Sequence, residues 1–495
     1  MDAGPRKTLT QLGLTAQGGA QAFVTGLAVD SREVRDGYLF AALAGTRAHG
    51  GEFIQYALRQ GAAAILTDTR GAEIARAELE GSTAALIVAQ DPRQTLAYTA
   101  ALWFGSQPET MIAVTGTNGK TSVASFTRQI WTQLGLEAVN LGTTGVEGAY
   151  DAPLAHTTPE PITLHRVLHE AEMRGITHAA MEASSHGLAQ RRLDGVRLSA
   201  AAFTNFTQDH LDYHATFVEY FDAKAGLFDR VLPEDGVAVI NIDDPRGPDM
   251  ALIAHDRGQD LITVGRGDDA DLVLQAQRFE STGQTMRFAF EGRPFQASVP
   301  LIGGFQGENL LVAAALCIAC GAGAPQVFET LPHMKTVRGR MQLAATRVNG
   351  AAVFVDYAHT PDAVATALKA LRPHVMGRLV AIVGAGGDRD PGKRPLMGAA
   401  AADHADVVIV TDDNPRSEDP GAIRRAVLQG CPDAAEVGDR AEAILRGVDA
   451  LGPGDALLIL GKGHETGQTV GEDVLPFDDC EQASVAVAAL DGGIA

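Results

Sequence analysis

One segment of the chain combines the residue types that bind a nucleotide phosphate. In the run MIAVTGTNGKTSVASFTRQIW (111–131), an apolar stretch predicts a buried strand, and a Gly/Thr/Asn turn leads into a helix that begins near Lys120. Backbone N–H groups at a helix N-terminus face an anion, and the helix dipole favours its negative charge. Lys120 can reach the terminal phosphates, and the Thr121 hydroxyl is placed to bind Mg²⁺. The segment therefore predicts a site for ATP or GTP.

The match of this segment to the phosphate-loop pattern G-x-x-x-x-G-K-[ST] is incomplete. Val114 stands where the first glycine belongs. The alternative is a glycine-rich turn without a ligand, but G-K-T-S directly after an apolar strand favours phosphate binding. The residues predicted to surround the nucleotide phosphates are Thr115, Gly116, Thr117, Asn118, Gly119, Lys120, Thr121 and Ser122.

Polar residues also follow other apolar runs. They are Glu182, Ser184, Ser185 and His186 after one predicted strand, Asn205, Asp209, His210, Asp212 and His214 after the next, and Asp356, His359 and Asp362 after a third. A single such residue is usually a solvated loop residue, but ligands of open parallel sheets bind at the carboxyl ends of strands. The repetition therefore predicts a shared site. Glu182 and His210, with Thr121, supply oxygen and imidazole ligands of the kinds that hold Mg²⁺.

Segments with the pattern of buried strands alternate with helical segments along almost the whole chain. This alternation predicts an α/β fold with parallel sheets. A length of 495 residues corresponds to roughly three domains of ~150 residues each. We expect an α/β N-terminal domain (1–105), a central P-loop ATPase-like domain with a parallel sheet (106–333) and a C-terminal Rossmann-like domain (334–495). No G-x-G-x-x-G follows a strand with the spacing that a nicotinamide cofactor requires.

The composition is acidic, with 40 Lys and Arg against 61 Asp and Glu and a net charge of −21. This charge argues against nucleic acid or an anionic membrane as a general partner, although a local basic pocket can still hold an anionic small molecule. The N-terminus lacks the apolar core of a signal peptide. We expect a cytoplasmic protein that works as a monomer, since neither a heptad pattern nor an extended exposed apolar strand calls for an oligomer.

The longest apolar run, 310–324, is too short to span a bilayer and predicts a buried helix. Cys317 and Cys320 form a C-x-x-C within it. No second Cys or His pair at ligand spacing lies nearby, so we interpret them as buried structural thiols rather than a metal or redox site.

Taken together, these motifs resemble the Mur ligases, the ATP-dependent amide-forming synthetases of peptidoglycan precursor assembly. The matching runs follow the family's order: TGTNGKTS (115–122), HTTP (156–159), EASSHGL (182–188), TNFTQDHLDYH (204–214), AKAGLF (223–228), RGRM (338–341), DYAHTPDA (356–363), GGDRDPGKR (386–394), DNPR (413–416) and GKGHE (461–465). Related folate-polyglutamate synthetases share the phosphate loop. HTTP, DNPR and GKGHE together resemble the family members that add the third amino acid, which implies UDP-N-acetylmuramoyl-L-alanyl-D-glutamate and meso-diaminopimelate as substrates, with ATP and Mg²⁺.

The resemblance also implies roles for individual residues. The nucleotide-sugar substrate would contact Ser31, in DSREVRDGYLFAALAG (30–45), together with Thr157, Thr158, Ser184, Gln190 and Arg192. The nucleotide would lie near Asn309, Arg340, Asp356 and His359. Diaminopimelate would contact Arg389, Asp413, Asn414, Pro415, Arg416, Gly461 and Glu465. The chain departs from the family at Thr46–Arg47–Ala48–His49–Gly50, where relatives often carry a His-Gln-Ala-Asp-Gly-like run, so the resemblance leaves open whether these side chains contact the UDP directly. For Arg192 the alternative is a solvated charge.

The implied chemistry is phosphorylation of the dipeptide carboxylate by ATP, followed by attack of an amine on the acyl phosphate. Lys120 would neutralise the transferring phosphoryl group, and Thr121, Glu182 and His210 would hold Mg²⁺. In YFDAKAGLF, Lys224 occupies the position where the family carries a lysine carbamylated by CO₂, with an ordinary phosphate-pairing lysine as the alternative.

Arg416 offers a planar fork for the distal carboxylate of diaminopimelate, which lysine lacks. The alternative is that Arg416 only braces the turn at Pro415. A competing hypothesis for the whole chain is a regulatory nucleotide-binding switch without ligase activity.

Overall fold

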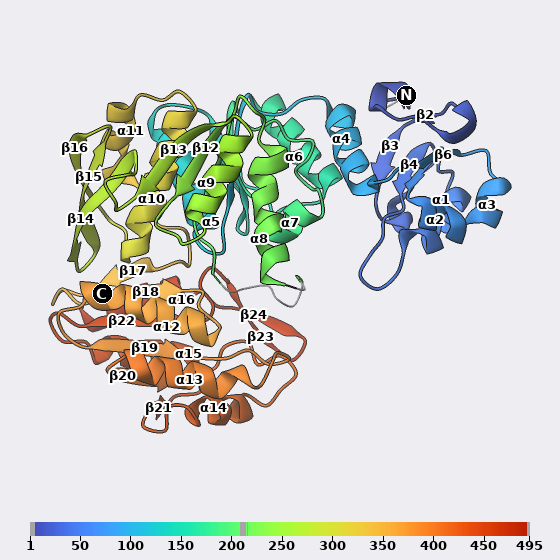
Figure 1. Ribbon diagram of the computed structural model, residues 1–495. Helices are drawn as coiled ribbons and strands as arrows, with labels where there is room; N and C mark the ends of the chain where they lie inside the picture. Colours follow the sequence, from blue (N-terminus) through green and yellow to red (C-terminus); the bar gives the residue numbers. More distant parts are fainter. Residues whose placement is uncertain (1–4, 208–213, 215, 493–495) are drawn as a thin grey trace. The chain divides into compact units, whose positions relative to one another are not determined.

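The computed structural model describes residues 5–207, 214 and 216–492 (Figure 1). The chain forms two compact units. Unit 1 contains Met1–Gly265 and Val312–Val327, and unit 2 contains Arg266–Leu311 and Phe328–Ala495. No helix among the described residues is both long enough and apolar enough to cross a membrane.

The N-terminal part of unit 1, blue in Figure 1, is built around a small parallel sheet. Its strands, in spatial order, are β3 (Gly26–Ala28), β4 (Tyr38–Ala41), β5 (Ala64–Thr67) and β6 (Ala85–Val88). Its helices are α1 (Ile54–Arg59), α2 (Thr69–Ile74), α3 (Arg76–Glu80) and α4 (Pro92–Phe104), and β1 (Lys7–Thr8) pairs with β2 (Phe23–Val24). Apolar side chains cover the sheet on both faces, which explains why its strands read as continuous apolar runs.

A larger sheet follows in unit 1. Its strands, in spatial order, are β13 (Asp260–Gly265), β12 (Val237–Asn241), β11 (Ala200–Phe203), β7 (Thr110–Thr115), β10 (His178–Glu182), β8 (Ala138–Gly142) and β9 (Gly145–Gly148). Neighbours are parallel except for the β8–β9 hairpin. Glu182 pairs with Val114 and Phe203 with Thr115, so the carboxyl ends of β10, β7 and β11 lie at one edge.

The helices of this part of unit 1 are α5 (Lys120–Gln133), α6 (Pro161–Met173), α7 (Ser185–Ala189), α8 (Phe217–Gly226) and α9 (Gly247–Asp256). Side chains cap the N-termini of α6, α7 and α8, whereas α5 and α9 begin without a side-chain cap. The Glu160 carboxylate accepts from backbone N–H groups of the first turn of α6, and the Thr216 hydroxyl does the same for α8. α8 continues directly into a short π-helix, Leu227–Val231.

Unit 2 contains an antiparallel group of strands and a doubly wound sheet. The antiparallel strands are β14 (Leu272–Glu280), β15 (Gly283–Phe290) and β16 (Arg293–Val299). The second sheet has the order β17 (Gln342–Thr346), β18 (Ala352–Asp356), β22 (Ala456–Leu460), β19 (Leu379–Val383), β20 (Val407–Val410) and β21 (Ala435–Glu436), in which β17 alone of these strands is antiparallel. β23 (Gly467–Val470) and β24 (Asp473–Pro476) form a hairpin.

Helices cover both faces of the second sheet. One apolar cluster contains side chains of α12 (Pro361–Leu371), α13 (Lys393–His404) and α14 (Pro420–Leu428). A separate cluster contains side chains of α15 (Arg440–Asp449) and α16 (Asp479–Leu490). This is the arrangement of a Rossmann-like domain, in which ligands bind beyond the carboxyl ends of the strands.

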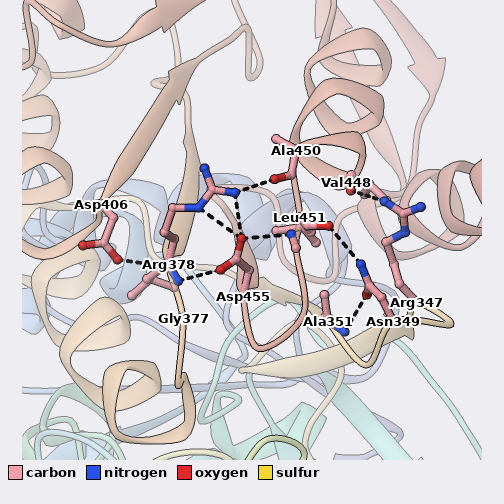
Figure 2. A network of polar contacts seen from close by, with 12 residues as sticks. Arg347, Asn349, Ala351, Gly377, Arg378, Asp406, Val448, Ala450, Leu451 and Asp455 are labelled. Atoms are coloured by element: carbon pink, nitrogen blue, oxygen red, sulfur yellow. Dashed lines mark hydrogen bonds and ion pairs between the residues drawn. The ribbon is translucent and has the colours of Figure 1, made fainter.

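The amino ends of these strands are fixed by a polar network (Figure 2). Asp455, just before β22, accepts hydrogen bonds from the Arg378 backbone N (2.7 Å) and from its Nη2 (2.8 Å). Arg347 donates to the Val448 carbonyl at 2.9 Å (Figure 2). It also pairs with Asp491 at 2.8 Å. The network holds the sheet at the end opposite to the one where ligands are expected.

The α/β fold with parallel sheets is confirmed. The expected buried helix over 310–324 is wrong at its end, because α10 spans Gly304–Ala319 and α11 begins at Ala324 and runs to Thr330. Gly321, with φ of +92°, lies in the intervening turn. Cys320 therefore follows the helix and is only half-buried, whereas Cys317 is fully buried. Both are free thiols, and burial raises the pKa of Cys320 to about 12.

Candidate functional site

The phosphate-loop segment forms the predicted strand, turn and helix. β7 ends at Thr115, and α5 begins at Lys120. Gly116 has a φ of +146°, and a Cβ at this position would lie 1.9 Å from Thr204 Oγ1. Gly119 has a φ of +88°. Glycine is therefore required at both turns that aim the loop amides and the start of α5 in one direction.

Two lysine ammonium groups share one carbonyl oxygen of this loop. Lys120 Nζ donates to the Gly116 carbonyl (2.9 Å) and the Thr117 carbonyl (2.8 Å). Lys224 Nζ, on α8, donates to the same Gly116 oxygen at 2.8 Å. Lys224 is 1% exposed and lies 4.5 Å above the Tyr220 ring. The loop thus concentrates positive charge where phosphate oxygens are expected.

Glu182 brings a buried carboxylate to the same edge of the sheet. It lies at the end of β10 and is 1% exposed. It accepts hydrogen bonds from Thr121 Oγ1 (3.0 Å) and the Thr143 backbone N (2.7 Å). A Cβ at Gly142 would come 2.0 Å from its Oε1, so β8 must carry glycine there. Burial raises the pKa of Glu182, opposed by the positive charge of Lys120.

The predicted magnesium ligands are brought together in part. Thr121 and Glu182 are in direct contact, and their hydroxyl and carboxylate oxygens fit the hard donors that Mg²⁺ prefers. His210, the third predicted ligand, lies outside the described residues, as do Asp209 and Asp212. Among the side chains that are described, no group of three or more His, Cys, Asp or Glu forms a metal-binding cluster.

The residues predicted to hold the muramoyl-dipeptide end connect to Glu182. Thr158 Oγ1 donates to the Glu182 carbonyl (2.8 Å) and accepts from the Ser184 backbone N (3.0 Å). Arg192 donates to the Thr158 carbonyl and, through Nη2, to Gln190 Oε1 (2.8 Å). These side chains therefore form one hydrogen-bonded chain leading away from the phosphate loop.

Thr157 completes this group from the other side. Its Oγ1 lies 3.0 Å from Thr143 Oγ1, which in turn donates to Glu182 Oε2 at 3.3 Å.

Two hollows of unit 1 adjoin this chain. One, of about 170 Å³, is lined by Val29, Leu43, Arg93, Leu96, Glu160, Pro161, Gln190 and Arg192. The other, of about 660 Å³, is lined by Ala44, Asp68, Gln90, Asp91, Pro92, Arg93, Gln94, Thr95 and Arg191. Arg93 borders both, at the start of α4, and places a cation beside the predicted sugar-nucleotide residues.

The predicted uridine segment lies near these hollows. Ser31 follows the lining residue Val29 by two positions, and its carbonyl accepts from Gln60 Nε2 at 2.7 Å. His49 uses Nδ1 to accept from the Gly51 backbone N (2.9 Å) and has Nε2 3.2 Å from Asp68. Both ring nitrogens of His49 are thus engaged within the fold.

Unit 2 contains the other residues predicted to lie near the nucleotide. Asp356, at the end of β18, accepts from the backbone N–H groups of Met341 and Ala358, each at 2.8 Å. Burial raises the pKa of Asp356, opposed by the charge of Arg340. The Arg340 guanidinium lies 5.3 Å from the centre of the Tyr357 ring.

His359 and Asn309 complete the nucleotide set. His359 Nδ1 donates to the Tyr357 carbonyl at 2.8 Å, so it lies beside the Asp356 and Arg340 group. Asn309 lies on α10, is buried and donates to Gln306 Oε1 at 3.3 Å.

The predicted diaminopimelate residues come together at the carboxyl ends of β20 and β22. Gly461 has a φ of +116°, and a Cβ there would lie 2.3 Å from Asp413 Oδ2. Asn414 Nδ2 donates to Glu465 Oε2 at 2.8 Å. The DNPR and GKGHE segments, nearly fifty residues apart in sequence, therefore form one polar surface.

Arg416 lies at the edge of this surface in a left-handed backbone conformation, with φ of +50°. Its Nη1 donates to the Gly387 carbonyl at 2.7 Å, and its backbone N donates to the Thr469 carbonyl at 3.0 Å. Arg389, from the GGDRD segment, is exposed. The guanidinium of Arg416 thus braces a loop in this structure while lying next to the predicted carboxylate site.

Comparison with known proteins identifies the family. Three family models match successive parts of the chain: Mur ligase family, catalytic domain (23–103), Mur ligase middle domain (114–317) and Mur ligase, glutamate ligase domain (339–463). A UDP-N-acetylmuramoyl-L-alanyl-D-glutamate–2,6-diaminopimelate ligase from Bradyrhizobium diazoefficiens is 49% identical over 469 residues, which cover 94% of this chain and 95% of the relative. The chain belongs to the Mur ligase family. The same enzyme from Caulobacter vibrioides is 46% identical over 475 residues, which cover 94% of this Mur ligase and 96% of the relative.

Solved structures agree with this assignment. A UDP-N-acetylmuramoyl-L-alanyl-D-glutamate–2,6-diaminopimelate ligase structure is 35% identical and has a TM-score of 0.72, with coverage of 94% of this chain and 95% of that chain. A MurF ligase from Thermotoga maritima in complex with ADP is 18% identical, with a TM-score of 0.58 and coverage of 95% and 98%, which indicates a shared fold.

Two polar residues of the site in this Mur ligase were missed by the motif analysis. Lys462, fully buried, donates to Asn414 Oδ1 at 3.0 Å and lies 3.4 Å from Glu465 Oε2. The sequence feature that could have indicated Lys462 is a lysine within a glycine-rich turn directly after an apolar strand. Thr143, which contacts Glu182, lies in the short β8–β9 turn and had no such signal.

Proposed function

We propose that this Mur ligase adds meso-2,6-diaminopimelate to UDP-N-acetylmuramoyl-L-alanyl-D-glutamate, with hydrolysis of ATP to ADP and phosphate. The observation that carries the proposal is the joining of DNPR and GKGHE into one polar surface, the proposed amino-acid pocket, that presents both a guanidinium and a carboxylate. Diaminopimelate has a carboxylate and an ammonium on its distal carbon, which are complementary to such a pair. Relatives that are 46–49% identical are named as ligases of the same substrates, which supports this choice.

The reaction requires activation of a carboxylate, because its negative charge repels nucleophiles and its oxide is a poor leaving group. The γ-phosphoryl group of ATP passes to a carboxylate oxygen of the dipeptide, and ADP leaves. The amine nitrogen then attacks the acyl carbon, phosphate leaves with the former carboxylate oxygen, and the amine proton passes to solvent or a base. Such steps depend mainly on positioning and charge neutralisation. Lys120 is proposed to neutralise the charge of the transferring phosphoryl group, which is supported by the hydrogen bonds of its ammonium group to two carbonyl oxygens of the phosphate loop.

Thr121, Glu182 and His210 are proposed to hold Mg²⁺, which would supply charge neutralisation to the phosphates. Contact between Thr121 and the buried Glu182 carboxylate supports this set. Asn309, Arg340, Asp356 and His359 are proposed to lie near the nucleotide. Ser31, Thr157, Thr158, Ser184, Gln190 and Arg192 are proposed to bind the sugar-nucleotide substrate, supported by the hydrogen-bonded chain from Glu182 to Gln190.

Arg416, with Arg389, is proposed to bind the distal carboxylate of diaminopimelate, and Glu465 with the Gly461 carbonyl to accept from its distal ammonium. Asp413, Asn414 and Pro415 shape the same surface. L-Lysine would leave Arg416 unpaired and would place its own ammonium near the guanidinium. Loss of such a charge-assisted pair corresponds to about a thousandfold discrimination.

The test is a competition of diaminopimelate against L-lysine on the purified protein with ATP, Mg²⁺ and the UDP-muramoyl-dipeptide. We expect incorporation of diaminopimelate alone, and we expect Arg416→Ala to reduce the preference. Equal incorporation of lysine, or an unchanged preference in Arg416→Ala, would contradict the pocket assignment. If the protein binds ATP but releases no phosphate in response to the two substrates together, the result would instead support a regulatory nucleotide switch.

We further propose that the functional domains are 1–105, 106–333 and 334–495, that the enzyme is cytoplasmic and that it acts as a monomer. The three family models, which change near residues 103–114 and 317–339, support these boundaries.

A further inference from the structure

A fully buried ion pair lies behind the pocket formed by DNPR and GKGHE. Arg440 is the first residue of α15, and Asp479 is the first residue of α16. Their contact is bidentate: Nε to Oδ1 and Nη2 to Oδ2 are both 2.7 Å. Both side chains are 0% exposed. Burial would lower the pKa of Arg440, but the Asp479 carboxylate outweighs this effect and raises it, so the guanidinium stays charged.

The same guanidinium holds the backbone of both pocket segments. Arg440 Nη1 donates to the Asp412 carbonyl at 3.2 Å, and Nη2 donates to the Leu460 carbonyl at 3.0 Å. Asp412 directly precedes the DNPR segment, and Leu460 directly precedes the GKGHE segment. The strands that lead into them, β20 and β22, are not neighbours, because β19 lies between them. Sheet hydrogen bonds therefore cannot set the spacing of these two segments directly.

Other contacts of Asp413 and Asn414 also depend on the distance between the DNPR and GKGHE segments. Asp413 Oδ2 occupies the space beside Gly461 that a Cβ would fill. Gln468 Nε2 donates to the Asp413 carbonyl at 2.7 Å, and the Thr469 backbone N donates to Asn414 Oδ1 at 2.9 Å. A shift of either segment would disturb these contacts and the Asn414–Glu465 bond together.

We propose that Arg440, oriented by Asp479, is a positioning residue that sets the separation of the two segments and thereby the affinity of the pocket for its amino-acid substrate. The inference rests on the proposed function, because it assigns that pocket to diaminopimelate. Stability alone does not explain the pair, since well-packed apolar residues often replace a buried ion pair without loss. A guanidinium fork can satisfy a carboxylate and two carbonyls from one plane, whereas a lysine ammonium at the same place cannot.

The experiment compares Arg440→Lys with a matched control, Arg347→Lys. Arg347 also pairs with an aspartate, Asp491, and donates to one backbone carbonyl, but it lies at the amino end of the same sheet. KM for diaminopimelate, KM for the UDP-muramoyl-dipeptide, kcat and thermal unfolding are measured for both variants and the wild type. We expect Arg440→Lys to raise KM for diaminopimelate about tenfold or more, since small misplacements of binding groups have effects of this size. We expect Arg347→Lys to leave it within about twofold at a similar loss of thermal stability, and both variants to keep KM for the UDP-muramoyl-dipeptide.

Asp479→Asn is the second variant, with Asp491→Asn as its control. It keeps the shape of the Asp479 side chain and gives the same readout if Arg440→Lys does not fold. An unchanged KM for diaminopimelate in Arg440→Lys or Asp479→Asn, or an equal rise in the matched controls, would overturn the positioning role while the wild type still ligates diaminopimelate. A wild type that does not ligate diaminopimelate would overturn the proposed function and this inference with it.

Discussion

At the scale of single residues, Glu182 is a carboxylate that the fold buries at a cost. Burial raises its pKa above the ordinary 4.5, so without Mg²⁺ its ionised form destabilises the folded state at neutral pH. We expect Glu182→Gln to stabilise the metal-free protein at pH 8. A glutamine can keep the bond from the Thr143 backbone N, while the Thr121 hydroxyl can turn to accept from its amide. The same variant should lower kcat by about a hundredfold or more if Glu182 holds Mg²⁺.

The pH dependence of this stability follows from the direction of the shift. Below the unfolded pKa both states are protonated, and the two proteins should have similar thermal stability. As pH rises through the raised pKa, the wild type loses stability that Glu182→Gln keeps, so the difference in Tm should grow to a plateau. Thermal unfolding in EDTA from pH 4 to pH 8 measures this difference. The exposed Glu137→Gln is the control, and a Tm difference that shrinks with rising pH would contradict the assignment.

Lys224 places a second buried ammonium group next to that of Lys120. Its Nζ and that of Lys120 both donate to the Gly116 carbonyl, so two ammonium groups approach each other. Loss of a proton from the Lys224 ammonium would free the Nζ lone pair to attack CO₂, and loss of a second proton would give a carbamate that attracts Lys120 and can lie beside Mg²⁺. We expect a carbamate signal by ¹³C NMR in ¹³C-bicarbonate that disappears in Lys224→Arg and persists in the exposed Lys369→Arg. We also expect Lys224→Ala to lower kcat by about a hundredfold or more. A near-normal kcat would exclude a catalytic role, and a missing NMR signal would count against the carbamate.

At the scale of elements, the strand–turn–helix of the phosphate loop depends on the missing side chain at Gly116. An alanine there would have its Cβ 1.9 Å from Thr204 Oγ1 and would adopt a φ of +146°. The loop must shift, so we expect Gly116→Ala to lower kcat/KM for ATP about a hundredfold.

Gly135→Ala provides the matched control, because it follows the other end of α5. Its φ is +81°, but no atom lies within 4 Å of the added Cβ. It should lose about 1 kcal/mol of stability through backbone strain and keep kcat/KM for ATP. Steady-state kinetics and thermal unfolding of both variants test this contrast, and equal losses of kcat/KM would refute it.

The elements also show what was predictable from the sequence. The ends of β10, β18, β20 and β22 could be recognised because an apolar run stops at polar residues, and those residues form the candidate site. The end of α10 was not recognised, because apolar residues continue through the turn at Gly321. No sequence pattern indicated a role for Arg440, because its partner Asp479 lies 39 residues away and its other contacts are with backbone carbonyls. Such contacts are set by tertiary packing and leave no local spacing to read.

At the scale of the whole molecule, the proposed reaction needs residues of both units. The phosphate loop belongs to unit 1, and the DNPR and GKGHE segments belong to unit 2. An amine must come within about 3–3.5 Å of the acyl carbon to attack it, and an acyl phosphate must be kept from water until then. We therefore expect bound ligands to draw the two units of one chain together.

Sedimentation velocity at assay concentration tests this expectation together with the monomeric state. A single species of 51.8 kDa should be present with and without ligands. Addition of a non-hydrolysable ATP analogue, the UDP-muramoyl-dipeptide and diaminopimelate should raise its sedimentation coefficient without changing its mass, because a more compact particle experiences less friction. Gly116→Ala, with a displaced phosphate loop, should show a smaller rise at the same ligand concentrations. A stable dimer would contradict the monomer, and an unchanged coefficient under saturating ligands would contradict closure within one chain.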